Sequence, residues 1–354
     1  MPSIRPRGVP LWISSGRTVY ITHRHRAFKE DTLAYLKRQQ HVSPYLDPAV
    51  VSKLGNMDLK ARLIVEGYIA GLHRSPYHGF SVEFAEYRQY MQGDSIKTID
   101  WKVYGKTDRS YVKVFEEETN LIANILLDKS GSMGFPTEED IRERFREDER
   151  RGREHGHHID KLTYGCLLAA SLAYLMIRQQ DAVGLLLFDD RVRTMIPHRS
   201  VRKQLFHILH NLESITPGER TSISPTLHEM AERMKRRGLV IIISDLMDDP
   251  DELIMGLKHF RHRQHEVIVF HVLDPYEIDL DYRDEVEFED LESGRRIRLE
   301  PAFLREQYNS DVAAWIDRLE RSCRNHQIDY NLLRTDMPFD QALTAYLGKR
   351  LRLG

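Results

Sequence analysis

The chain of 354 residues is long enough for one large domain or two of ordinary size. Its 52 Lys and Arg residues almost balance its 54 Asp and Glu residues, which excludes an overall charge that would draw it to nucleic acid or to a membrane surface. Its most apolar stretch, residues 166–177, is shorter than the roughly 20 residues of a membrane-spanning helix, and the N-terminus lacks the apolar core of a signal peptide, so we expect a cytoplasmic protein.

The first third of the sequence predicts an arm followed by a β-rich region. Residues 1–58 carry scattered basic side chains and a helical pattern at 28–41, which we interpret as an N-terminal arm, mobile or paired as an edge strand, with one helix. Alternating, β-branched and aromatic side chains make residues 59–120 a β-rich region, with predicted strands at 59–71, 81–90 and 110–118.

From residue 121 the pattern changes to alternating strands and helices. Apolar runs predict strands at 121–128, 182–189, 239–245, 266–274 and 328–335. Helical patterns lie at 161–180, 201–212, 224–238, 251–263, 301–326 and 339–351. This alternation predicts an α/β domain over residues 121–350, with a mostly parallel sheet and helices on both faces. A hairpin at 282–300 and a charged helical excursion at 137–158, which we expect to be exposed, interrupt it.

Oxygen-bearing side chains follow two of these strands. Asp128, Ser130 and Ser132 come directly after the first strand of the domain, and Asp245 closes another strongly apolar strand. Ligands of open α/β sheets bind at the carboxyl ends of strands, and hard divalent cations bind through oxygen. Thr221, in a loop that leads into a helix, adds a third hydroxyl. We therefore predict a site for Mg²⁺, or for Mn²⁺ or Ca²⁺, formed by Asp128, Ser130, Ser132, Thr221 and Asp245.

Simpler interpretations exist for each candidate. Asp and Ser side chains also satisfy free amides at helix starts, so the turn after Asp128 could be a cap alone. His155, His157 and His158 could hold a metal, but a solvated His-rich tip explains them with fewer assumptions.

The order Asp-x-Ser-x-Ser, then a loop Thr, then a later Asp resembles the metal-ion-dependent adhesion site of the von Willebrand factor A fold. Upstream, residues 67–120 resemble the signature region of a bacterial family known as domain of unknown function fifty-eight. The clearest matches are Tyr87-Arg88, Gly93-Asp94, Ile99-Asp100-Trp101 and Val112-Lys113. The resemblance covers nearly the whole chain and implies a von Willebrand factor A-like domain, with a smaller β-rich region formed largely from the N-terminal part.

Two positions depart from the pattern of the family. Glu219 and Arg220 precede Thr221 where Gly is usual, so Thr216 and Thr226 remain alternatives for the hydroxyl of this loop. Leu246 follows Asp245, where relatives often have Gly.

The predicted site favours binding over catalysis. Asp128 and Asp245 would be engaged around the cation, and no His or Cys lies in the motif loops to act as a base or nucleophile. We therefore expect a non-catalytic, metal-dependent protein-binding adaptor whose cation accepts a Glu or Asp from a partner. The resemblance implies that the partner is a MoxR-type AAA+ ATPase or its client, in the assembly or activation of client proteins. The alternatives are a metal-dependent hydrolase or phosphatase, and a scaffold with a vestigial metal site.

Overall fold

The computed structural model describes residues 11–13, 17–22, 51, 56–74, 87–89, 111–113, 121–151, 159–218, 223–280, 282, 286–289 and 296–353. The chain forms two compact units, one of residues 1–68 with 121–354 and the other of residues 69–120. Thr221, the predicted helix at 28–41, and His155, His157 and His158 lie outside the described residues. None of the helices in the described ranges combines the length and the apolar character that crossing a membrane requires.

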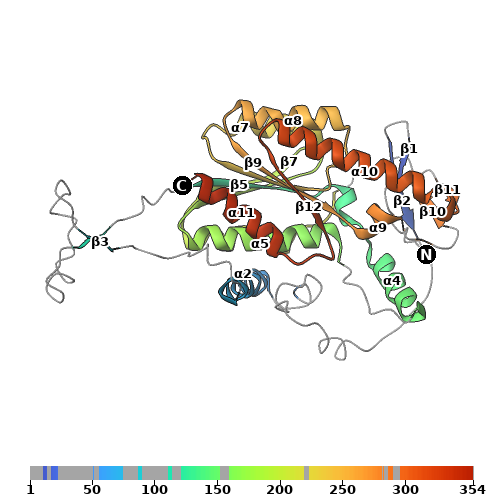
Figure 1. Cartoon of the computed structure of the whole chain (residues 1–354), viewed down its shortest axis with the longest axis horizontal. Helices are drawn as coiled ribbons and strands as arrows, with labels where there is room; N and C mark the ends of the chain where they lie inside the picture. The colour runs from blue at the N-terminus through green and yellow to red at the C-terminus, as the bar shows by residue number, and fades with distance from the viewer. Residues whose placement is uncertain are drawn as a thin grey trace. The chain divides into compact units, whose positions relative to one another are not determined.

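The larger unit is built on a six-stranded sheet with the order β12-β9-β8-β5-β6-β7 (Figure 1). Its strands are β5 (Ile122–Asp128), β6 (Ala182–Phe188), β7 (Val192–Arg199), β8 (Leu239–Ser244), β9 (Glu266–Leu273) and β12 (Asp329–Arg334). Neighbouring strands are parallel except β6 and β7, which are antiparallel. The prediction of an α/β fold with a mostly parallel sheet is confirmed.

Helices cover both faces of this sheet (Figure 1). One face carries α7 (Ile223–Arg233), α8 (Pro250–His262) and α10 (Pro301–Asn325), and the other carries α5 (Lys161–Arg178) and α11 (Asp340–Leu353). α6 (Arg202–Glu213) packs beside α5. Every residue of β8 is buried, as expected for a strand covered on both faces. Leu126, Ile242, Leu227, Leu253 and Leu319 belong to the core on the α7, α8 and α10 side.

A second, antiparallel sheet joins the N-terminal arm to the predicted hairpin. Its strands are β1 (Leu11–Ile13), β2 (Arg17–Thr22), β10 (Val286–Glu289) and β11 (Arg296–Leu299), in the order β1-β2-β10-β11. β10 pairs with β11, which confirms the hairpin, and β1 forms an edge, as one interpretation of the arm expected.

The predicted strand at 59–71 is wrong, because the structure has a helix there, α2 (Met57–Arg74). Its buried residues Ala61, Ile64, Val65 and Tyr68 follow the three- and four-residue spacing of a helix face, which outweighs the β-branched content. In the smaller unit, β3 (Tyr87–Gln89) and β4 (Tyr111–Lys113) fall within predicted strands and pair antiparallel.

Candidate metal centre at the strand ends

The turn after β5 gathers three oxygen-bearing side chains below the surface. Asp128 is the last residue of β5, and its Oδ1 accepts the amide of Ser130 at 2.8 Å. The hydroxyls of Ser130 and Ser132 lie 2.9 Å apart and share a hydrogen bond. All three side chains are buried. Ser130 precedes a 3₁₀ turn (Gly131–Gly134) but makes no side-chain bond to its amides, so helix capping does not account for its hydroxyl.

The end of β8 meets the end of β5 because the two strands are neighbours and run parallel. Ser244 donates its hydroxyl to Asp128 Oδ2 at 2.6 Å and accepts the amide of Leu246 at 2.9 Å. Asp245 follows and is fully buried. The structure therefore brings together four of the five predicted ligands, Asp128, Ser130, Ser132 and Asp245. It adds Ser244, which strand pairing would have placed beside Asp128.

Leu246, where the family resemblance led us to expect Gly, has a backbone conformation that favours glycine. Its φ is 52°, in the left-handed region that side chains disfavour and glycine does not. Leu246 is also completely buried in the core beside α7 and α8. We infer that packing of its side chain offsets the strain of this turn.

A buried lysine completes the centre. Lys161, the first residue of α5, places its Nζ 2.7 Å from Asp245 Oδ2 and 2.6 Å from Glu277 Oε1. All three side chains have 0% exposure. Sequence reasoning missed both Lys161 and Glu277. The available signal was a lysine at the start of an apolar helix, where the helix dipole disfavours a cation unless a buried carboxylate compensates.

Carboxyl groups outnumber cationic groups among these side chains. Burial and the charge of Asp245 raise the pKa of Asp128 to about 7. Burial raises the pKa of Glu277 to about 7 as well, although Lys161 opposes the shift. Burial lowers the pKa of Lys161, but its ion pairs with Asp245 and Glu277 outweigh this and raise it above the usual value. Lys161 thus pairs with Asp245 and Glu277, while Asp128 is a third carboxyl group whose interaction with Asp245 is repulsive. A divalent cation would relieve this repulsion.

A histidine that the motif loops do not contain also reaches the centre. His271, on β9, bonds through Nε2 to the carbonyl of Asp245 at 2.9 Å and through Nδ1 to the hydroxyl of Tyr330. Burial lowers the pKa of His271 to about 3. With both nitrogens engaged, this ring is a structural neutral imidazole and not a base that works near neutral pH.

The loop that contains Thr221 borders the serine turn through its described end. Gly218 donates its amide to the carbonyl of Lys129 at 2.6 Å, and a Cβ at this position would lie 2.8 Å from Asp189 Oδ2. Of the alternatives to Thr221, Thr216 is exposed, and Thr226 donates its hydroxyl to the carbonyl of Asp189 at 3.5 Å.

The charged excursion forms the predicted helix, α4 (Glu138–Arg151), but the expectation that it is exposed is wrong for one face. Arg144 is buried, pairs with Asp274 at 2.9 Å and lies 3.8 Å above the ring of Tyr276. Asp274 and Glu277 form the capping box of α9 (Pro275–Asp279). The helix is therefore anchored to the short element that supplies Glu277, the second partner of Lys161.

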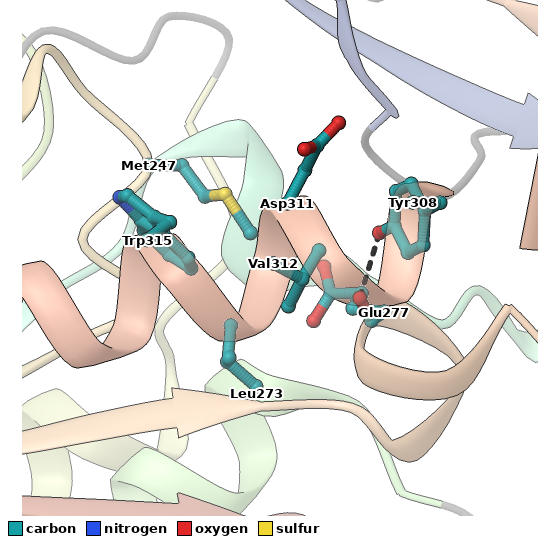
Figure 2. Close-up of a pocket in the computed structure, with 7 residues that line it drawn as sticks. All are labelled: Met247, Leu273, Glu277, Tyr308, Asp311, Val312 and Trp315. Atoms are coloured by element: carbon teal, nitrogen blue, oxygen red, sulfur yellow. Dashed lines mark hydrogen bonds between the residues drawn. The ribbon is translucent and has the colours of Figure 1, made fainter. Parts of the chain in front are cut away.

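Beside this element lies a small pocket between α9 and α10 (Figure 2). It has a volume of about 30 Å³, room for little more than water. The residues that line it are Met247, Leu273, Glu277, Tyr308, Asp311, Val312 and Trp315. Tyr308 closes one end by donating its hydroxyl to the carbonyl of Glu277 at 2.6 Å. The pocket is far too small for an organic substrate, which needs about 300 Å³ or more.

The donor set at the strand ends suits a hard cation. It offers two carboxylates and three serine hydroxyls, which are oxygen ligands of the kind that Mg²⁺ and Mn²⁺ accept. In the described ranges no group of three or more His, Cys, Asp or Glu side chains is placed to hold a metal, so any cation here depends on the hydroxyls.

Comparison with known proteins identifies relatives without an assigned role. A family model described as "Protein of unknown function DUF58" matches residues 86–147 and 152–316. Uncharacterised proteins of Mycobacterium tuberculosis and Mycobacterium bovis are each 24% identical over 311 residues, 86% of this chain and 91% of theirs. Among solved structures, BatB from Bacteroides thetaiotaomicron matches with a TM-score of 0.42 and 17% identity, over 66% of this chain and 99% of its own. An aerotolerance-related membrane protein from Bacteroides fragilis matches with a TM-score of 0.42 and 16% identity, over 65% and 99%.

Proposed function

The chain belongs to the family described as protein of unknown function DUF58, and we propose that it is a non-catalytic adaptor that binds a partner protein through a divalent cation. The observation that carries the proposal is the pair of buried carboxylates, Asp128 and Asp245, at the ends of neighbouring parallel strands. Burial and the charge of Asp245 raise the pKa of Asp128, and three serine hydroxyls lie beside the two carboxyl groups. A bound cation would stabilise these two carboxylates beside each other. An adaptor that binds its partner without a cation would have no use for such a buried pair.

Asp128, Ser130, Ser132 and Asp245 would hold the cation, together with Thr221 from the loop. When bound, the cation supplies a coordination position that a Glu or Asp of the partner fills. The protein side chains orient the site: Ser244 fixes Asp128 Oδ2, and Lys161 fixes Asp245 Oδ2. The four described ligands are buried, so the partner's carboxylate reaches the cation only when the residues that shield these side chains from solvent move aside. The partner in this proposal is a MoxR-type AAA+ ATPase or one of its clients.

The test is direct binding between the purified full chain and a purified MoxR-type ATPase, measured with Mg²⁺ and with a chelator. We expect binding that the chelator abolishes and that Asp128→Ala abolishes in Mg²⁺. The matched control is Asp317→Ala, which removes an exposed carboxylate from α10. Equal binding by wild type and Asp128→Ala, with or without chelator, would contradict the proposal.

One observation favours a second candidate, a scaffold whose metal site is vestigial. Lys161 already provides Asp245 with a buried cationic partner, and Glu277 shares it. In this candidate the ammonium takes over the neutralising role of a metal, and the centre only stabilises the fold. Mg²⁺ would then produce no binding heat with either the wild type or Lys161→Met.

A further inference from the structure

Two histidines meet between α7 and α8, in a cluster that shares no residue with the strand-end centre. His228 Nδ1 on α7 and His259 Nδ1 on α8 lie 3.1 Å apart, with ring planes inclined at 50°. Behind His259, Glu232 accepts a contact from its Nε2 at 2.8 Å. Arg263 holds the other oxygen of Glu232 at 2.6 Å. The cluster thus consists of a facing imidazole pair with an oriented carboxylate behind one ring.

The carboxylate sets the tautomer of His259. Nε2 must carry the proton that it donates to Glu232, so in the neutral form of the ring Nδ1 keeps its lone pair. His228 then donates its own Nδ1 proton across the 3.1 Å contact. A metal needs lone pairs on both Nδ1 atoms, and His228 provides its own by moving its proton to Nε2, with no change in net charge. A carboxylate behind a metal-bound histidine is the usual outer partner in protein metal sites.

From this geometry we propose that His228 and His259 form a binding site for a borderline transition-metal ion such as Zn²⁺, Ni²⁺ or Cu²⁺. Bonds of about 2.0–2.1 Å put two ligand nitrogens about 2.9 Å apart at a right angle and about 3.4 Å apart at the tetrahedral angle. The observed 3.1 Å lies between these values, so the rings must turn toward a common ion but need not move apart. Imidazole suits these metals and not Mg²⁺, which separates this site chemically from the strand-end centre.

Occupation would join α7 to α8, and α7 is itself tied at its N-terminus to the segment that follows β8. The first amides of α7, at Ile223 and Ser224, bond to Asp248 at 2.9 and 2.8 Å, and Asp248 lies three residues after Asp245. An ion held by both helices resists their separation and therefore stabilises the folded protein by mass action. Water completes its coordination, since in the described ranges no third His, Cys, Asp or Glu is placed to join it.

The test is titration of the full chain with zinc chloride, followed by calorimetry and by the shift in melting temperature. All proteins carry His155→Asn, His157→Asn and His158→Asn, which removes the competing His-rich segment. We expect one zinc-binding event that His228→Ala and His259→Ala each abolish, together with the rise in melting temperature. Glu232→Ala should weaken it by about 10- to 100-fold, as loss of an outer partner does.

Two variants serve as controls. His262→Ala removes an exposed histidine from the same helix, and Asp128→Ala disables the strand-end centre; both should bind zinc as the parent does. Zinc isotherms of His228→Ala and His259→Ala that match the parent would overturn the proposal. So would loss of the event in Asp128→Ala alone, because zinc would then occupy the strand-end centre.

Discussion

Replacing Asp128 by Asn should stabilise the metal-free protein, although it removes the central ligand of the proposed site. Burial and the charge of Asp245 raise the pKa of Asp128 from 3.8 to about 7 in the folded state. Between pH 3.8 and about 7 the carboxyl of Asp128 keeps its proton in the folded protein but loses it in the unfolded chain. The contribution of Asp128 to the free energy of unfolding therefore falls as pH rises through this range, and it stays unfavourable above about pH 7. At about 1.4 kcal/mol per pKa unit, the penalty is on the order of 4 kcal/mol.

Hydrogen bonding reduces the expected gain. The amide of Ser130 and the hydroxyl of Ser244 each donate to one oxygen of Asp128, and Asn keeps only one acceptor oxygen. A donor left without a partner costs about 1–3 kcal/mol, although the Ser244 hydroxyl can turn to accept from the new amide. We therefore expect Asp128→Asn to be more stable than the wild type by about 2 kcal/mol above pH 7.

Urea unfolding with a chelator measures this difference. The advantage of Asp128→Asn should disappear well below pH 7, where the native carboxyl of the wild type is protonated. Added Mg²⁺ should reduce the stability difference between Asp128→Asn and the wild type or reverse its sign, because only the wild type gains binding free energy. A variant that is less stable than the wild type above pH 7 in chelator would refute our account of two mutually repelling carboxylates.

Three further predictions concern the neighbours of Asp128. Lys161→Met should destabilise the protein by about 3–5 kcal/mol in urea unfolding, because Asp245 and Glu277 lose their buried cation; an unchanged midpoint would contradict the burial of these charges. Leu246→Gly should relieve about 1 kcal/mol of backbone strain but lose about 2–5 kcal/mol of core packing, so the same assay should find net destabilisation. His271, whose pKa burial lowers from 6.5 to about 3, should make stability fall by about 1.4 kcal/mol per pH unit below 6.5, since the unfolded chain takes up a proton that the native ring refuses. His271→Gln should lose this part of the pH slope, and equal slopes in both proteins would contradict the assignment.

Much of the fold follows from periodicity in the sequence. Fully buried strands such as β8 read as continuous apolar runs, and Asp160 and Asp249 cap the helices α5 and α8. Residues 59–71 form a helix and not the predicted strand because the helical spacing of Ala61 and Val65, which face the core of the larger unit, outweighs the local β propensity. The balance between the two depends on tertiary packing, which short windows of sequence do not record.

The residues of the candidate site are likewise only partly predictable from the sequence. Asp128, Ser130 and Ser132 are close in sequence, so a motif finds them, and strand order then places Asp245 beside them. Lys161 comes from a position 84 residues before Asp245, and its pairing depends on how α5 starts beneath the strand ends. No local pattern carries that information.

The central claim is that the strand ends bind a divalent cation, and calorimetric titration of the metal-free full chain with Mg²⁺ tests it most directly. We predict a single binding event in the wild type and in Asp317→Ala that is absent in Asp128→Ala. A wild-type isotherm without binding heat, or one that Asp128→Ala leaves unchanged, would contradict the account.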